Sequence, residues 1–262
     1  RNTCLKLLRL SVSFHSRLKA VSVMRCFPRQ IVLTLLFCLF ASSLFAADDW
    51  RVWRGPTGNG VAAAGQTPPV KWSETENIHW KTPLPGRGHA SPIVVNDRVL
   101  IATADESQEI QSVVCLARDS GKILWKTDVN RGGFAPKIHQ KNTHASPTLA
   151  SNGELVFAAF PHHESIQLTA LDLDGKQRWQ IRAGGFLPRA YQFGYGPSPI
   201  LYENTVIVAA EYEKNGYLAA FDQQTGKEVW RLDRPDKINF STPIVARIAG
   251  RDQLLHSGNS RV

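Results

Sequence analysis

Two histidines at matching positions before a Ser-Pro pair are the side chains in this sequence most suited to chemistry. His89 and His144 each stand two residues before a serine, Ser91 and Ser146, and a proline follows each serine. A neutral imidazole can bind a metal ion or hydrogen-bond an anion. Because no carboxylate accompanies the two rings in the sequence, the alternative is that each one caps its own loop by hydrogen bonding.

A second pair of candidates, Arg189 and Tyr191, stands in the segment LPRAYQFGY. Arginine and tyrosine are residue types that dominate binding hot spots, so these two side chains are predicted to contact a ligand or a partner. The alternative is packing within their own loop. His162 and His163, in PHHES, fall in the connection in the middle of a repeat and are predicted to be exposed to solvent.

The acidic residues that the sequence offers as catalysts are better explained by turns. Four aspartates, Asp119, Asp172, Asp174 and Asp222, stand in predicted hairpin turns, where their side chains cap the backbone. The chain shows no glycine-rich phosphate loop and no nucleophile motif. We therefore predict no catalytic residue and no metal ligand.

The elements that must position these residues come from a repeat. A Gly-Lys pair is followed three times by a tryptophan: Gly121 to Trp125, Gly175 to Trp179 and Gly226 to Trp230. A Ser-Pro pair precedes these tryptophans by 34, 33 and 32 residues, counted from the serine. Two markers in step, with a period of about 40 to 55 residues, are typical of propellers or solenoids.

Each copy of the repeat reads as two successive β-hairpins. The second copy contains the runs PTLA, ELVFAAF, IQLTALDL and QRWQIRA, separated by turns at 151–153 and 174–176. Four short runs of this kind predict a four-stranded antiparallel blade. The glycine of the last turn supplies a positive φ, and the tryptophan after it is predicted to fill the gap between adjacent blades.

The fold class predicted is therefore all-β, a β-propeller of four-stranded antiparallel blades. The predicted blades span residues 89–129, 144–183 and 196–234, with the start of a fourth at 240–262, after an N-terminal segment, 47–88. Trp80, in WKTPLPG, is a candidate for a ring-closing strand. Because closed propellers have about 4 to 8 blades, we expect an incomplete arc of three blades with partial flanking strands.

The net charge of +9 comes almost entirely from the N-terminal part of the chain. Residues 1–46 hold seven basic side chains and no acidic one, which leaves 24 Lys and Arg against 22 Asp and Glu in the remainder. A domain near +2 has no excess of cations to hold a phosphate backbone. The predicted folded part is thus not a nucleic-acid-binding protein.

Residues 24–46 are typical of a secretory signal peptide. Met24 is followed by Arg25 and Arg29, then by an apolar run and small residues that end at Ala46. A membrane anchor is the alternative, but the apolar run is shorter than the roughly 20 residues of a spanning helix. We therefore predict an exported protein, periplasmic or secreted, with no spanning segment after cleavage.

The residues around this signal carry most of the cysteines. Residues 1–23 are interpreted as an over-extended N-terminus, and Cys4, Cys26 and Cys38 all precede the predicted cleavage site. Cys115 would be the only cysteine of the mature protein, which allows no intrachain disulfide. It stands in the apolar run SVVCLA and is predicted to be a small buried residue.

The segment AFDQQTGKEVW, with its relatives CLARDSGKILW and TALDLDGKQRW, resembles the repeat of quinoprotein-type propellers, the pyrroloquinoline quinone (PQQ) repeat. The opening DDWRVWRGPTGNGV is similar to the start of exported bacterial proteins in this group. The resemblance covers about residues 48–262 and implies the propeller fold. It says less about activity, because one fold hosts many functions.

Three functions are compatible with this resemblance. We predict a binding or scaffold module of the cell envelope that contacts an envelope protein or a small ligand, without a required cofactor. The first alternative is a PQQ-dependent dehydrogenase of alcohols or sugars, for which the resemblance implies PQQ, calcium and a catalytic aspartate; the adjacent cysteines and the haem motif of such enzymes do not occur here. The second is a propeller that binds carbohydrate or another small ligand.

Two long segments between a tryptophan and the next Ser-Pro pair are the places where function is expected. They span residues 126–145 and 180–197 and are rich in glycine, aromatic residues, histidine and cations. Loops of this length on a rigid scaffold tend to carry function.

Overall fold

The computed structural model of the chain describes residues 49–258, and all of its regular structure in that range is β-strand. The predicted signal peptide, the predicted N-terminal extension and Cys4, Cys26 and Cys38 lie outside the described residues. In the described range no helix is long and apolar enough to cross a membrane.

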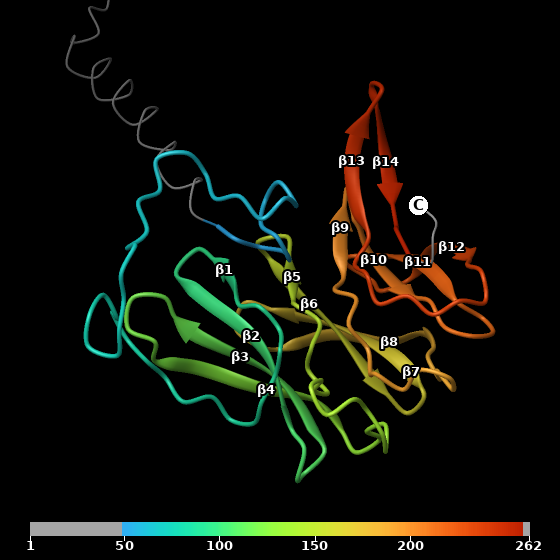
Figure 1. Cartoon of the computed structure of the whole chain (residues 1–262), viewed down its shortest axis with the longest axis horizontal. Coiled ribbons are helices and arrows are strands. Elements are labelled where there is room, and N and C mark those ends of the chain that lie inside the picture. Colours follow the sequence, from blue (N-terminus) through green and yellow to red (C-terminus); the bar gives the residue numbers. More distant parts are fainter. Residues whose placement is uncertain (1–48, 259–262) are drawn as a thin grey trace, which may run out of the picture. The chain divides into compact units, whose positions relative to one another are not determined.

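The strands form three four-stranded antiparallel sheets and one hairpin (Figure 1). The first sheet contains β1 (Ile93–Val95), β2 (Arg98–Asp105), β3 (Ile110–Ala117) and β4 (Ile123–Arg131). The second contains β5 (Ala150–Ser151), β6 (Leu155–His162), β7 (Ser165–Asp172) and β8 (Gln177–Gly185). The third contains β9 (Ile200–Tyr202), β10 (Thr205–Ala210), β11 (Tyr217–Asp222) and β12 (Glu228–Asp233), and the hairpin pairs β13 (Ile244–Ile248) with β14 (Arg251–Leu255).

Within each four-stranded sheet the spatial order of the strands follows their order in the chain. Such meanders are built from successive antiparallel hairpins, which need only short turns between neighbours. The prediction of an all-β fold made of four-stranded antiparallel blades is confirmed.

The apolar core lies between the sheets and not within any one of them. Along β6, Val156 and Phe160 belong to a core shared with Leu100 of the first sheet. Phe157, which points to the opposite face, belongs to a second core shared with Val208 of the third sheet. Because successive side chains of a strand alternate between faces, the second sheet must be apolar on both.

At three places a tryptophan packs over a glycine turn of the sheet that follows it in the chain. The pairs are Trp80 over Gly121, Trp125 over Gly175, and Trp179 over Gly226. All three glycines have positive φ, between 68° and 82°. A β-carbon on Gly175 would stand 2.6 Å from Cδ2 of Trp125, so only glycine satisfies both the backbone and the packing.

The same tryptophans also make a hydrogen bond across the gap. Nε1 of Trp125 donates to the carbonyl oxygen of Leu173 at 2.9 Å. Trp80 donates in the same way to Arg118 at 2.9 Å, and Trp179 donates to Gln223 at 3.0 Å. A ring that is large, apolar and able to donate suits a half-buried seam between sheets.

Trp80 makes this contact without belonging to a strand. Trp80 therefore packs on the first sheet in the same way that Trp125 packs on the second. The sequence suggested a ring-closing strand at Trp80, but the structure has no strand there. Trp230, on β12, is 37% exposed, and β12 is exposed along its whole length in the described part of the chain.

Hydroxyl groups connect the segments that come just before the first strands of neighbouring sheets. The backbone N–H of Ser91 donates to Oγ1 of Thr148 at 3.0 Å, and that of Thr148 donates to Oγ of Ser198 at 3.0 Å. The N–H of Ser198 in turn donates to Oγ1 of Thr242 at 2.9 Å. Prolines follow Ser91, Ser198 and Thr242 and have no backbone N–H to donate. The N–H and hydroxyl groups of the residues beside them therefore make the hydrogen bonds between neighbouring sheets.

The seam between tryptophan and glycine predicts a specific sensitivity to a single methyl group. Gly175→Ala should lower the free energy of unfolding by about 3 kcal/mol, because it adds backbone strain and displaces Trp125. Gly250→Ala is the matched control, since Gly250 has φ of 79° but no atom within 4 Å of the added carbon. It should cost only about 1 kcal/mol. Urea denaturation of both variants measures the difference, and equal losses would contradict the importance of the seam.

Candidate functional site

Two long loops and one hairpin turn enclose a cavity of about 290 Å³. The first long loop (residues 132–149) connects β4 to β5, and the second long loop (residues 186–199) connects β8 to β9. The turn between β6 and β7 completes the wall. We call this space the loop cavity. It brings together the two segments in which the sequence led us to expect function.

A side-chain amide holds the two long loops together. Nδ2 of Asn142, in the first loop, donates to the carbonyl oxygen of Phe193 at 2.5 Å. Its Oδ1 accepts from the backbone N–H of Thr143 at 2.8 Å and from the hydroxyl of Ser146. Gly194 has φ of 94°, and a β-carbon there would collide with Asn142. This pair fixes the width of the loop cavity.

Aromatic rings form two walls of the loop cavity. Phe134 stacks on His144 with 4.1 Å between ring centroids and 26° between planes. On the other side Phe186 meets Tyr195 edge to face at 5.1 Å. The Tyr195 hydroxyl donates to the carbonyl oxygen of Ala209 at 2.8 Å, so only its ring is offered to the cavity.

His144 and His162 both line the loop cavity and are both disposed to be neutral. Burial lowers the pKa of His144, and Nδ1 of its ring has no hydrogen-bond partner among the described residues. Burial likewise lowers the pKa of His162, whose Nε2 lies 3.4 Å from the carbonyl oxygen of Arg131. Imidazoles without charge can each donate or accept one hydrogen bond per nitrogen.

The turn between β6 and β7 is strained. His163 and Glu164 connect β6 to β7 and have φ of 46° and 56°. Positive φ at both central residues is the backbone of a type I′ hairpin turn, which strongly prefers Asn-Gly. His163 lies against Gly133 of the first long loop, where a β-carbon would collide with the imidazole. The turn thus keeps cavity-lining side chains at a cost in conformational energy.

The sequence predicted that both histidines of PHHES are exposed to solvent. His163 is exposed, but His162 is half-buried.

An exposed row of rings borders the loop cavity, and we call it the aromatic ridge (His139, Tyr191, Phe193 and Phe240). Centroid distances from Phe193 are 5.6 Å to His139, 5.6 Å to Tyr191 and 5.7 Å to Phe240. Tyr191 is 52% exposed and Phe193 is 44% exposed. Between them Gln192 points to the cavity side, because it lines the cavity and they do not.

Arg189 lies on the same loop but does not line the loop cavity. Its backbone N–H donates to Glu213 at 3.2 Å, and the N–H of Ala190 donates to the same carboxylate at 3.1 Å. The Arg189 side chain is exposed. Arg189 and Tyr191 are thus surface residues of a loop that Glu213 anchors from below.

His89 and His144 line different cavities. His89 is exposed and lines a more open cavity of about 490 Å³ at the inner ends of the sheets, together with Ser146, Ser198 and Phe240. We call this space the inner cavity. His144 is buried under Phe134 and lines the loop cavity instead. The two rings therefore hold matching positions in the repeat but do not share a site.

The described residues do not bring together the side chains that would hold the calcium ion implied by the resemblance to dehydrogenases. Residues 49–258 hold no group of three or more His, Cys, Asp or Glu side chains placed to share a metal ion. Cys115 is buried in β3, and burial raises the pKa of its thiol to about 11. It is the one cysteine in this range, so no adjacent cysteine pair is available there to cover a quinone.

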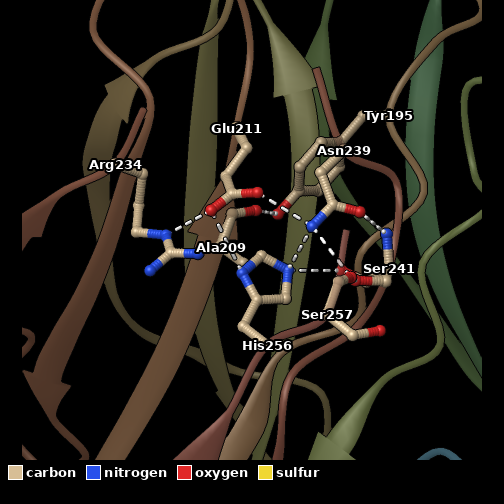
Figure 2. A network of polar contacts seen from close by, with 8 residues as sticks. All are labelled: Tyr195, Ala209, Glu211, Arg234, Asn239, Ser241, His256 and Ser257. Atoms are coloured by element: carbon tan, nitrogen blue, oxygen red, sulfur yellow. Dashed lines mark hydrogen bonds and ion pairs between the residues drawn. The ribbon is translucent and has the colours of Figure 1, made fainter. Parts of the chain in front are cut away.

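A buried polar network connects the third sheet to the last hairpin, and Figure 2 shows Arg234, Asn239 and His256 pointing toward the carboxylate of Glu211. Glu211, which directly follows β10, accepts from Nε of Arg234 and, at 2.8 Å, from Nδ2 of Asn239. Nδ1 of His256, directly after β14, lies 3.4 Å from the same carboxylate. The backbone N–H of Asn239 also donates to the Glu211 carbonyl oxygen, at 3.2 Å.

The network keeps Glu211 ionised although it is buried. Burial by itself would raise the pKa of this carboxyl group, but the nearby His256 ring and the hydrogen bonds from Arg234 and Asn239 outweigh it and lower the pKa to about 2. The partners of this carboxylate come from the segment after β12 and from the end of β14, so the network joins the third sheet to the hairpin. We therefore assign Glu211 to the attachment of the hairpin and not to chemistry.

Reasoning from the sequence missed the residues that close the loop cavity. Asn142 and Gly194 gave no signal, because their contact joins positions 52 residues apart. The PHHES turn did carry a signal, since a two-residue connection between β-runs without Asn or Gly indicates strain. Glu211 and His256 gave none, because neither belongs to the repeat pattern.

A family model described as "Outer membrane protein assembly factor BamB" matches residues 109–262. The outer membrane protein assembly factor BamB of Alkalilimnicola ehrlichii is 27% identical over 163 residues, which cover 61% of this chain and 36% of that protein. The dehydrogenase subunit of a quinone alcohol dehydrogenase of Gluconobacter oxydans is 27% identical over 181 residues, covering 63% and 22%. The chain spans about a third or less of the length of these relatives.

Among solved structures, the quinohemoprotein alcohol dehydrogenase ADHIIG of Pseudomonas putida HK5 is similar, with a TM-score of 0.41 and 23% identity. The match covers 59% of this chain and 22% of that one.

The strained turn predicts a gain in stability on substitution. Replacing His163 and Glu164 together by Asn and Gly should raise the free energy of unfolding by about 1 kcal/mol, because Asn-Gly adopts the two positive φ values with less strain. Urea denaturation measures the change. Glu203→Gly is a suitable comparison, since Glu203 has φ of 50° in the β9–β10 turn, away from the cavity. A loss of stability in the double variant would show that the native side chains stabilise the turn.

The low pKa of Glu211 predicts a pH dependence of stability. The pKa of Glu211 in the folded protein, about 2, lies below the ordinary value of 4.5, so its contribution to stability is fully present above pH 4.5 and is lost as pH falls toward 2. The loss should amount to about 3 kcal/mol. Glu211→Gln should remove this slope while other carboxylates still titrate. Denaturation of both proteins between pH 5 and pH 2 tests it, and parallel curves would contradict the assignment.

Proposed function

The chain belongs to the PQQ-repeat family of β-propellers whose model is described as outer membrane protein assembly factor BamB, and from this premise we propose that it is a binding module of the cell envelope. It contacts another envelope protein through the aromatic ridge and Arg189. The protein is exported, and it acts as a scaffold and not as a catalyst.

The aromatic ridge is the observation that carries this proposal. Large rings exposed side by side are uncommon on monomeric surfaces and mark sites of interaction. Tyrosine, phenylalanine and arginine are enriched in interface cores, and tyrosine and arginine dominate hot spots. Tyr191 and Phe193 of the ridge lie on the second long loop together with Arg189, and Phe240 follows the third sheet.

The loops that carry the ridge are held in place before any partner binds. Asn142 ties the first loop to the second, and Glu213 accepts two backbone N–H groups beside Arg189. A preorganised surface loses less conformational entropy on association than a free loop. This supports a binding role for the loops.

The relatives agree with a role in the envelope. The Alkalilimnicola relative is named as an outer membrane protein assembly factor. The near-neutral balance of charges after residue 46 offers no basic surface for nucleic acid. A protein partner in outer-membrane assembly is therefore the contact that we propose.

Site-specific photo-crosslinking tests the proposal in cells. A photoreactive phenylalanine analogue at position 191 should crosslink to one envelope protein. In the separate variant Arg189→Ala, Tyr191→Ala, co-purification of that protein should fall at least about tenfold, because both changes remove hot-spot side chains.

Trp72 provides the matched control for this experiment. It is an exposed aromatic residue in the segment before β1 and makes no contact with the ridge. The same analogue at position 72 should yield no such crosslink, and Trp72→Ala should leave co-purification unchanged. Equal crosslinking at both positions, or an unaltered yield in the double variant, would refute the ridge as the binding surface.

A quinoprotein dehydrogenase is the second candidate function, and the Gluconobacter relative favours it. The described residues supply neither a metal cluster nor a cysteine pair for the cofactor. Turnover of alcohols or sugars by the full-length protein with added PQQ and calcium would support this candidate over the scaffold.

A further inference from the structure

We propose that the loop cavity binds a single p-hydroxyphenyl group, with the ring between the two aromatic walls and the hydroxyl group hydrogen-bonded to imidazole. The inference deepens the proposed function, because the cavity borders the aromatic ridge and would receive a tyrosine side chain of the bound protein. A free small phenol has the same chemistry, and the experiment below separates the two sources.

The loop cavity is large enough to hold one substituted aromatic ring. Its volume is about 290 Å³, and a cavity of about 150 Å³ already holds benzene. Pockets for drug-sized ligands range from about 300 to 1,000 Å³, so this cavity is at the small end.

The walls of the cavity select an aromatic occupant. The Phe134–His144 stack presents ring faces and edges on one side, and the Phe186–Tyr195 pair does so on the other. Rings attract each other in offset and edge-to-face arrangements beyond the effect of apolar burial alone. The walls belong to different long loops, and the Asn142 bond to Phe193 sets their separation.

The polar groups of the cavity select a hydroxyl group on that ring. His144 is more than nine-tenths buried, and its ring lines the cavity with Nδ1 unpartnered. A buried N–H without a partner is rarer than a buried lone pair, so the proton is best placed on Nε2, which can then donate to an occupant. Burial keeps both His144 and His162 uncharged by lowering the pKa of each. A phenol both donates and accepts, which complements neutral imidazoles.

Charged occupants are disfavoured by the same lining. The two charged side chains there, Lys137 and Glu164, have opposite signs and are both exposed. They offer no net charge to a carboxylate or an ammonium group, which would also lose hydration on entry. A neutral ring with one hydroxyl group avoids this penalty.

A pair of probes that differ by one hydroxyl group tests the inference directly. The full chain is titrated with p-cresol and, separately, with toluene, and binding is followed by protein NMR chemical shifts. p-Cresol should bind about tenfold more tightly than toluene, because a site built to hydrogen-bond a hydroxyl group discriminates against the analogue that lacks it. Equal affinities, or no binding of either probe, would overturn the proposal.

His144→Phe assigns the preference to the imidazole. The substitution preserves a ring to stack on Phe134 and removes no hydrogen bond of Nδ1, which has none. It should abolish the preference for p-cresol while toluene still binds, and an unchanged preference would refute the role of His144. Leu187→Trp is a second variant, which should exclude both probes by filling the cavity from a half-buried wall position. Retention of p-cresol binding in Leu187→Trp would place the probe elsewhere.

A third pair of probes identifies the source of the phenol. N-acetyltyrosinamide that binds at least as tightly as p-cresol, and more tightly than N-acetylphenylalaninamide, indicates a tyrosine side chain with its backbone outside the cavity. Exclusion of both amides while p-cresol binds indicates a free phenol. These titrations need no partner, so failure of crosslinking at position 191 and failure of phenol binding are separate results.

Discussion

The contact between a tryptophan and a glycine turn of the next unit is the interaction on which the rest of this structure depends. A four-stranded sheet cannot bury both of its faces alone, so each blade must be pressed against a neighbour. Trp125 and Trp179 close this seam from one side, and Gly175 and Gly226 make room for them on the other. The positive φ of each turn favours glycine, and glycine has no β-carbon to block the ring.

The seam gives the loops a fixed base. The first and second long loops leave the last strands of consecutive blades, so the distance between their ends is set by the packing of those blades. Asn142 then needs only one bond to Phe193 to define a cavity. The proposed site is therefore built by a pair of loops, and the frame beneath them can stay constant while the loops vary.

The candidate site was predictable only where it followed the repeat or the lengths of the connections. The two long segments could be predicted to form the candidate site, because they exceed the usual length of a connection. Their meeting was not, since Asn142 and Gly194 are joined by a side-chain bond that leaves no periodic trace. His144 shows the limit of sequence reasoning most clearly. Its position in the repeat matches that of His89, yet His144 is buried under Phe134 whereas His89 is exposed to solvent.

The sequence by itself determined the blade, because short β-rich runs and the glycine turns between them are local constraints that each hairpin must meet on its own. It also determined that blades would stack, since apolar side chains on both faces of β6 have no other way to leave water. Only the tertiary structure decided which loop side chains share a cavity and which carboxylate, Glu211, is buried with Arg234 and His256. Each of these contacts joins residues that are far apart in the chain and occurs only once in the fold. It therefore leaves no repeated pattern in the sequence from which it could be predicted.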